Sequence, residues 1–471
     1  MAAVVEQVHK LTSRMAMDLG RTPPSSLNER FADLQKLLEI VAEIDKLQIN
    51  FPRAYSRSRW PNMPKFERWC KNAGIKSDRL QAKQVEGYGI GLFAKEDISI
   101  GEVLITVPRP IALTLRHLER RSGLAKILKA GPLLKLVGTT SLALALLYET
   151  FRKDSFWRDY IAILPADEES PFSFSEAELL AIKHTSCFSK VDSMVRNICR
   201  QYSYIYNLFF TEDSDLGGSG ITPVTFTFEN FRWAMFMAVS RGNHLPCPEN
   251  SRIEFERDSL AFIPHWDMVN HDSSVPMCSD YDSENNVIRF LAGKEWRQNE
   301  QVFTSYGERT NSDFLVHYGF VPHNSEKYAV VIQLGYTSND SNYELRTDVM
   351  KKHNFKTSEN FCLIKDKMVS IDENAFRFSL MFVANKEQLT ILKTAESSAT
   401  VDEEWQNKAK DFLSNRLMLM AQACRTGILK APREQVRPFI QTFVDMEVKL
   451  YEESAKFVKT PAVWPSVLTA A

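Results

Sequence analysis

The chain has 471 residues, of which 44% are hydrophobic and 25% charged, and its 58 Lys and Arg nearly balance its 59 Asp and Glu. This composition is typical of a folded globular protein, and the net charge of -1 argues against a dedicated nucleic-acid binder, which would carry a basic excess. No apolar run approaches the roughly 18 residues of a membrane span. The N-terminal segment also lacks the continuous apolar stretch of a secretory signal. We therefore expect neither a nucleic-acid partner nor a membrane.

The seven cysteines point to a reducing environment. Their number is odd and no two form a CxxC pair, which disfavours both a disulfide framework and a zinc site recognisable from spacing. Free thiols are usual in the cytoplasm and the nucleus. We therefore expect a cytoplasmic protein, with the nucleus as a second location, and no bound metal.

The predicted elements alternate between helical and strand-like blocks. Two helices are expected at 4–17 and 27–47, because a Pro-Pro break separates two amphipathic segments. Glycines and alternating apolar residues predict short strands and tight turns over 84–114. Helical periodicity returns over 115–206 and in a helix at 229–241, which begins near Thr227 or Phe228. Strand-like segments follow at 259–263, 287–291 and 301–305, and the chain after Pro322 is predicted to be mainly helical.

A glycine cluster lies in the first strand-rich block. Gly87, Gly89 and Gly91 form GxGxG, whereas a dinucleotide-binding fingerprint needs GxGxxG followed by a helix. The following residues lack a helical period, so that fingerprint is excluded. Two interpretations remain open: a hairpin turn, or a backbone that comes close to a ligand.

Three further motifs could carry chemistry. In IPHWDMVNH, His265 and His271 are too far apart for a zinc motif and lack a third ligand nearby, so we expect the Asn270-His271 pair to hydrogen-bond a group in a cleft. In SRGNHLP, Gly242 can cap the preceding helix. In SYGERTN, Tyr306 is either a packed strand-end tyrosine or a hydroxyl at a cleft edge.

The motifs GYGIGLFA, RGNHLP, IPHWDMVNH and SYGERTNSDFLVHYGF, in this order, resemble SET-domain methyltransferases. FWRDYIAILP at 156–165 is similar to the branch of the Rubisco large-subunit methyltransferases. Within that branch, the chain resembles the actin-histidine methyltransferases in Arg59 ten residues before Trp69, in RxNxxP at 241–246 and in IPxWDMxNH at 263–271. The resemblance implies an α+β fold with short sheets and a pseudoknot-like threading. It further implies an N-terminal helical region at 1–77, a SET domain at 78–322 with a helical insert at about 115–240, and an all-helical substrate-binding domain at 323–471.

The same resemblance implies S-adenosyl-L-methionine as the cofactor. Phe320 is expected against the adenine. Arg59 and Arg241 are expected at the methionine carboxylate or other polar edges of the cofactor, because a guanidinium fork suits a carboxylate. The chain departs from the actin-specific pattern at Tyr88, Gly242 and Tyr318, where those enzymes carry Glu, Gln and Ser. The expected cofactor contacts are Arg59, Tyr88, Gly89, Ile90, Arg241, Asp267, Met268, Val269, Asn270, His271, Tyr318, Gly319 and Phe320.

The acceptor residue follows from proton chemistry combined with the resemblance. Neutralising a lysine of pKa ~10.4 at pH 7 costs about 4.6 kcal/mol, whereas a histidine is mostly neutral already and needs only orientation. Asn243 lies where an amide can accept the imidazole Nδ1 proton. Tyr306 and Asn243 are therefore the predicted catalytic residues, and Trp266, Leu245 and Arg309 the predicted substrate contacts.

The resulting hypothesis is a monomeric protein-histidine N-methyltransferase that modifies Nε2 of a histidine in actin. A lysine methyltransferase that acts on another protein, and a non-catalytic SET-like binding module, remain alternatives.

Overall fold

The computed structural model describes residues 2–56, 58–114, 138–166, 170–210, 221–245, 260–322, 327–394, 398–460 and 464–469. These residues form two compact units, one made of 1–173 and 192–308 and the other of 174–191 and 309–471. The first part of the predicted insert, from 115 to 137, lies outside the described residues. No helix of the described ranges is long and apolar enough to cross a membrane.

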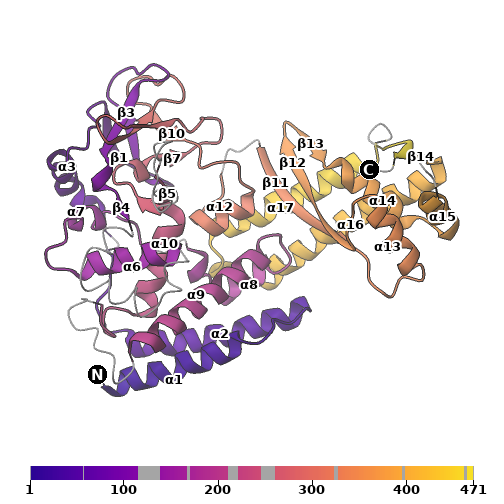
Figure 1. The fold of residues 1–471 in the computed structure, drawn as a ribbon, viewed down its shortest axis with the longest axis horizontal. Helices are drawn as coiled ribbons and strands as arrows, with labels where there is room; N and C mark the ends of the chain where they lie inside the picture. The colour runs from indigo at the N-terminus through magenta and orange to yellow at the C-terminus, as the bar shows by residue number, and fades with distance from the viewer. Residues whose placement is uncertain are drawn as a thin grey trace. The chain divides into compact units, whose positions relative to one another are not determined.

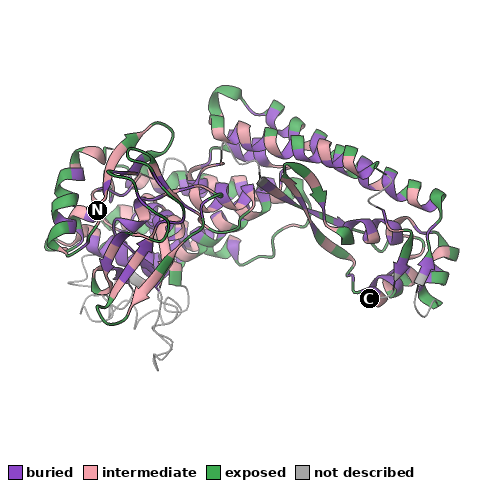
Figure 2. Cartoon of the chain, turned by 90° about the horizontal axis from the view of Figure 1, so that it is seen from above, coloured by how far each residue is buried: buried purple, intermediate pink, exposed green. Residues whose placement is uncertain are grey.

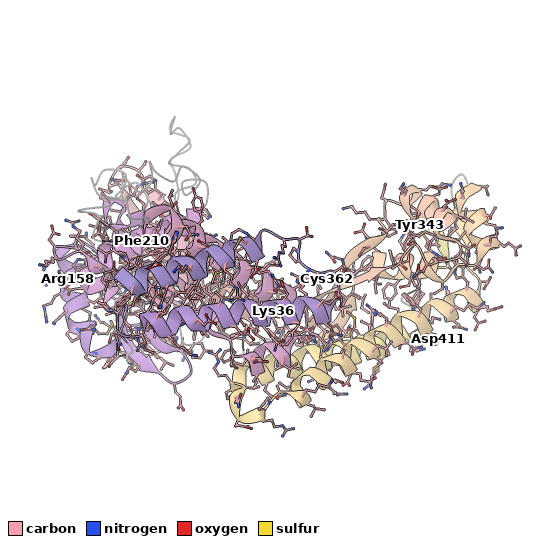
Figure 3. The ribbon with its side chains drawn as sticks, turned by 90° about the horizontal axis from the view of Figure 1, so that it is seen from below. Lys36, Arg158, Phe210, Tyr343, Cys362 and Asp411 are labelled. Atoms are coloured by element: carbon pink, nitrogen blue, oxygen red, sulfur yellow. The ribbon has the colours of Figure 1, made fainter. Side chains whose placement is uncertain are left out.

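The first unit begins with the two predicted helices, α1 (Ala2–Leu19) and α2 (Leu27–Gln48). Ser26 precedes α2 without a capping hydrogen bond from its side chain. The apolar face of α2 is buried, whereas Lys36, labelled in Figure 3, is exposed. This pattern is that of an amphipathic helix packed on one side.

Three small sheets carry the strand-rich blocks of this unit (Figure 1). The first has the order β1-β2-β10-β7, in which β1 and β2 form an antiparallel hairpin and β10 pairs with β7 in parallel. The hairpin confirms the turn interpretation of the glycine cluster. The other sheets have the orders β3-β9-β8 and β4-β6-β5. The strands are β1 (Leu80–Val85), β2 (Gly89–Ala94), β3 (Val103–Pro108), β4 (Leu113–Thr114), β5 (Gly242–His244), β6 (Leu260–Phe262), β7 (Asn270–His271), β8 (Ser279–Asp282), β9 (Val287–Leu291) and β10 (Gln301–Thr304).

Helices complete the first unit. The apolar run of α6 is wholly buried and packs against α10. The predicted start of α10 is confirmed, because the Thr227 side chain accepts a hydrogen bond from the Asn230 amide at 3.1 Å. The helices are η1 (Trp60–Asn62), α3 (Met63–Asn72), η2 (Arg109–Ile111), α6 (Gly138–Phe151), α7 (Arg158–Ile161), η4 (Pro171–Ser173), α9 (Phe188–Phe209, of which the part from Asp192 belongs here), α10 (Phe228–Arg241) and η5 (Trp266–Met268).

The second unit is mainly helical, as expected, but it is not all-helical. A three-stranded sheet of order β11-β12-β13 and a small β14-β15 pair lie among its helices. The reason is visible in β11, where Tyr328, Val330, Ile332 and Leu334 alternate between buried and more exposed neighbours. Figure 2 shows α16 and α17 with their facing sides buried and their outer sides exposed. The elements are α8 (Glu176–Ile182), α12 (Asn311–Tyr318), β11 (Lys327–Gly335), α13 (Tyr343–Lys352), β12 (Ser358–Asp366), β13 (Met368–Ile371), α14 (Glu373–Val383), α15 (Lys386–Thr394), β14 (Ser398–Thr400), α16 (Glu403–Lys430), η6 (Arg433–Gln435), α17 (Pro438–Val458) and β15 (Val467–Thr469).

The compact units divide the chain differently from the expected domain bounds. The second unit begins its main segment after residue 308 rather than after 322, and it also takes 174–191 from the middle of the chain. The expected bounds of the three family domains stay predictions.

Candidate functional site

The IPHWDMVNH motif and the glycine cluster, which are far apart in the sequence, meet at β2. Because β7 and β10 run in parallel, Phe303 lies opposite Asn270 and Thr304 opposite His271. The Asn270 side chain donates from Nδ2 to the carbonyl of Ile90 at 3.2 Å. A Cβ atom at Gly91 would lie 2.7 Å from the Gln301 Nε2 and 3.1 Å from the Asn270 Nδ2. Glycine at this position therefore lets two amide side chains approach the strand closely.

His271 is held by both of its ring nitrogens. Its Nδ1 accepts the backbone N–H of Tyr306 at 3.0 Å, and its Nε2 lies 3.0 Å from the Ser273 hydroxyl. An Nδ1 that accepts a hydrogen bond leaves the proton of the neutral ring on Nε2. The Tyr306 hydroxyl donates to the Val269 carbonyl at 2.8 Å, and its ring centroid is 5.1 Å from that of His271. The His271 and Tyr306 segments are thus fixed to each other.

A charge cluster lies beside these strands. Asp267 is almost fully buried, and its Oδ2 accepts the Tyr160 hydroxyl at 2.5 Å and lies 3.7 Å from the Arg241 Nη1. Arg241 also donates to the Asp267 backbone carbonyl. The Arg59 Nη1 approaches the Cβ position of Gly89 at 3.8 Å, and Arg59 interacts electrostatically with both Arg241 and Asp267.

Burial perturbs the pKa values in this cluster. Desolvation, together with the nearby charge of Arg241, lowers the pKa of Arg59 to about 9. Burial also raises the pKa of the Asp267 carboxyl, while Arg241, Tyr160 and Arg59 act in the opposite direction. Two like-charged guanidinium groups therefore share one buried carboxylate, an arrangement common at functional sites.

Several buried polar atoms in this region have no hydrogen-bond partner within the described residues. They include the donors Arg59 Nε and Gln301 Nε2 and the acceptor Asp267 Oδ1. Buried polar atoms are normally paired, so such a group indicates a missing polar ligand or water. A donor and acceptor set of this kind fits a molecule that carries a carboxylate and an amino group.

Asn243 follows α10 on the short strand β5, opposite Ala261 of β6. Its Nδ2 donates to the Arg241 carbonyl at 3.0 Å. The preceding Gly242 is extended, and a Cβ atom there would lie 2.4 Å from the Ala238 carbonyl oxygen. A side chain at 242 would therefore require α10 or β5 to shift.

Several predicted contact residues have buried side chains. Trp266 is 9% exposed and packs edge-on against Phe290, with ring centroids 4.9 Å apart, and Leu245 is 4% exposed. Both side chains are packed in the core of this structure, and the substrate contacts of Trp266 and Leu245 stay predictions. Met268 and Val269 are also buried, so that only their backbone groups are suited to contact a ligand.

The Tyr88 turn is open to solvent. Gly87 and Gly89 have positive φ angles of 76° and 75°, which favour glycine. Tyr88 between them is 46% exposed, and its ring lies 6.1 Å from that of Phe303. This turn places Tyr88 and the backbone of Ile90 on the same hairpin.

The remaining predicted residues belong to the second unit. Tyr318 ends α12, and Gly319 caps this helix in the left-handed conformation. Phe320 packs 5.6 Å from Phe314, and Arg309 lies over the Tyr318 ring at 5.4 Å. Their roles in cofactor and substrate binding stay predictions.

Tyr160 and Gln301 were missed as site residues by the sequence analysis. Tyr160 lies in the FWRDYIAILP segment, which is held by the hydrogen bond from the Trp69 Nε1 to the Phe156 carbonyl at 2.8 Å. No local pattern connects Tyr160 with Asp267, which is 107 residues away. The glycine at 91 was the only available sign of Gln301. No group of three or more potential metal ligands occurs in the described ranges.

Comparisons with known proteins agree with this geometry. The family described as SET domain matches residues 89–307. The actin-histidine N-methyltransferase of Mus musculus is 26% identical over 97% of this chain and 78% of its own length, and that of Homo sapiens is 27% identical over 90% and 71%.

Solved structures agree in fold. The SET domain of LSMT bound to lysine and AdoHcy aligns with a TM-score of 0.61 at 18% identity, covering 84% of this chain and 90% of that one. Rubisco LSMT bound to AdoMet aligns with a TM-score of 0.60 at 19% identity, covering 85% and 93%. At this level of identity, the two likenesses establish the fold.

Proposed function

We propose that this chain, a SET-domain protein methyltransferase, transfers a methyl group from S-adenosyl-L-methionine to Nε2 of a histidine in actin. Two features support the proposal: the relatives named actin-histidine N-methyltransferase, and the site formed by β2, β7, β10 and η5 in the first unit. The solved structures of similar fold contain AdoMet or AdoHcy.

The residues of the first unit fit the amino-acid part of that cofactor. Arg59 and Arg241 would bind the carboxylate, because both guanidinium groups lie near the buried Asp267 and Arg59 also lies beside Gly89 of β2. Asn270, His271 and the backbone of Ile90 would bind other polar groups of the cofactor. The cofactor supplies a methyl group on a sulfonium, which is transferred with the loss of a neutral thioether.

The acceptor must meet that methyl group in line. The lone pair of the histidine Nε2 forms the new N–C bond as the C–S bond breaks, and the ring then loses its Nδ1 proton to solvent. Tyr306 would line the channel, since its hydroxyl is fixed by the Val269 carbonyl. The contribution of the protein is therefore to position the ring and exclude water.

The hydrogen bond made by the Asn243 side chain is the observation that supports histidine rather than lysine as the acceptor. Its Nδ2 donates to the Arg241 carbonyl, so the side-chain amide is held by its nitrogen and its oxygen serves as the acceptor. An oxygen held in this way suits the Nδ1–H of an imidazole whose Nε2 lone pair is free to react. A lysine ammonium does not require this arrangement.

The test uses one peptide from actin with His or Lys at the acceptor position and the wild-type enzyme, Asn243→Ala and Asn243→Phe. We expect Asn243→Ala to lower kcat/KM on the His peptide about tenfold or more, and Asn243→Phe to lower it and raise activity on the Lys peptide. Asn285→Ala is the control, because Asn285 is an exposed turn residue bonded to Asp282. Mass spectrometry measures the products. A wild-type preference for Lys, or one His-to-Lys ratio for all variants, would contradict the proposal.

We also propose a monomer located in the cytoplasm with a nuclear share. Six cysteines of the described residues are free thiols, in keeping with a reducing compartment.

A further inference from the structure

Tyr160 is a buried residue for which the methyl transfer described above provides no role. It lies on α7, whose first residue Arg158 is exposed (Figure 3), whereas Tyr160 itself is fully buried. Its hydroxyl donates to the Asp267 Oδ2 at 2.5 Å. The hydroxyl of a buried tyrosine normally finds a partner, but here the partner is a carboxylate beside two guanidinium groups.

α7 is fixed from both sides, so this hydroxyl has a defined position. The Trp157 Nε1 donates to the Ile111 carbonyl at 2.8 Å, and the Asn62 Nδ2 donates to the Ala162 carbonyl at 3.1 Å. The Tyr160 ring also stacks on that of Trp69, with centroids 6.3 Å apart. The segment that carries Tyr160 is therefore bonded to the residues directly after Arg59.

Asp267 connects Tyr160 with the two arginines. Its Oδ2 lies 3.7 Å from the Arg241 Nη1, and Arg241 also donates to its backbone carbonyl. Without a buried carboxylate, Arg59 and Arg241 would repel each other in a poorly solvated region. Asp267 needs donors of its own to stay ionised there, and Tyr160 supplies one of them.

We propose that Tyr160 is a positioning residue, whose hydroxyl holds the Asp267 carboxylate so that Asp267 can keep Arg59 and Arg241 in place for the carboxylate of the cofactor. This inference rests on the cofactor site of the proposed function. It assigns the Asp267 Oδ2 a role through the two arginines, in addition to the ligand contact for which the unpaired Oδ1 is suited.

The proposal has a pH signature. The groups that face Asp267 are Arg59 before η1, Cys70 on α3, Tyr160 on α7 and Arg241 on α10. The Tyr160 hydroxyl lowers the pKa of the Asp267 carboxyl, so removing it raises that pKa further. When the pH is lowered, a variant without the Tyr160 hydroxyl should therefore lose cofactor affinity at a higher pH than the wild type.

The experiment measures the affinity of the full chain for S-adenosyl-L-methionine by calorimetry between pH 5 and 8. We expect Tyr160→Phe to bind about tenfold more weakly and to shift the acid limb of the affinity profile to higher pH. Tyr202→Phe is the matched control, because Tyr202 is equally buried but bonds Gln48 and Phe226 instead. Asp267→Asn is the second variant. The double variant Asp267→Asn/Tyr160→Phe should show the same acid limb of the affinity profile as Asp267→Asn alone.

An unchanged affinity and profile in folded Tyr160→Phe would overturn the proposal, and so would equal shifts in Tyr160→Phe and Tyr202→Phe. If Tyr160→Phe does not fold, the affinity profiles of wild type and Asp267→Asn are compared instead. If both proteins lose cofactor affinity over the same acidic pH range, Asp267 is not ionised and the proposal is overturned. This calorimetric result does not depend on which residue accepts the methyl group. An enzyme that binds the cofactor but methylates lysine would refute the proposed function and leave the role of Tyr160 intact.

Discussion

His265 makes the stability of the protein depend on pH. It precedes η5 with a positive φ of 72°, and its ring is 8% exposed, with Nε2 2.8 Å from the Ser77 hydroxyl. Burial lowers the pKa of His265 from 6.5 to about 4, and the charge of Lys95 acts in the same direction. The folded protein therefore binds this proton less readily than the unfolded chain.

The sign and size follow from linkage. Because the folded-state pKa lies below the unfolded one, the contribution to stability is complete above pH 6.5 and is lost as the pH falls toward 4. The difference between pKa values of 6.5 and about 4 corresponds to about 3.4 kcal/mol in the free energy of unfolding. About 2 kcal/mol of this stability is lost between pH 8 and pH 5. Acid should thus weaken the region that holds Asp267.

The assay compares wild type with His265→Asn, because asparagine does not titrate and tolerates a positive φ. Urea unfolding at pH 8, 6.5 and 5 measures the free energy of unfolding of both proteins. We expect the stability advantage of the wild type to shrink by about 2 kcal/mol across this range. Other titrating groups cancel in the difference, so a difference that stays constant with pH would refute the reasoning.

Two further changes test the site. Tyr306→Phe removes the hydroxyl that donates to the Val269 carbonyl, so kcat should fall about tenfold or more while calorimetry finds cofactor affinity unchanged; an unchanged kcat would make Tyr306 a packing residue. Gly242→Ala places a Cβ 2.4 Å from the Ala238 carbonyl oxygen, so it should lower the free energy of unfolding by about 1–3 kcal/mol and impair methylation. Gly138→Ala, where a Cβ meets nothing within 4 Å, is the control, and equal thermal stability of the two variants would contradict the clash.

Local signals predicted many elements of the fold. The start of α10 at Thr227, the strand at 287–291 and the hairpin around Gly87 follow from caps, alternation and turn residues. The strand β11 carried an equally clear alternation, but it was overlooked because the surrounding chain has helical periodicity. The resemblance to a family with a helical C-terminal domain favoured the same error.

The candidate site was only partly predictable, because its contacts are long-range. The parallel pairing of β7 with β10 connects segments more than 30 residues apart, and no spacing rule predicts it. Tyr160 and Asp267 meet across an even longer separation. The burial of Trp266 against Phe290 depends on how η5 packs on β9, which a single sequence does not reveal.

The composition of the second unit has a consequence for its synthesis on the ribosome. Its α8 packs against α16 and α17. The buried Glu178 accepts two hydrogen bonds from the Arg437 side chain, and the Cβ position of Gly427 lies 3.1 Å from the Ala181 carbonyl. About 220 residues separate the end of α8 from the start of α16. At about 5–20 residues per second, α8 waits roughly 10 to 40 seconds for its partners, with apolar side chains exposed. The second unit therefore completes its packing only at the end of translation, and α8 is the segment through which chaperones would best recognise an unfinished chain.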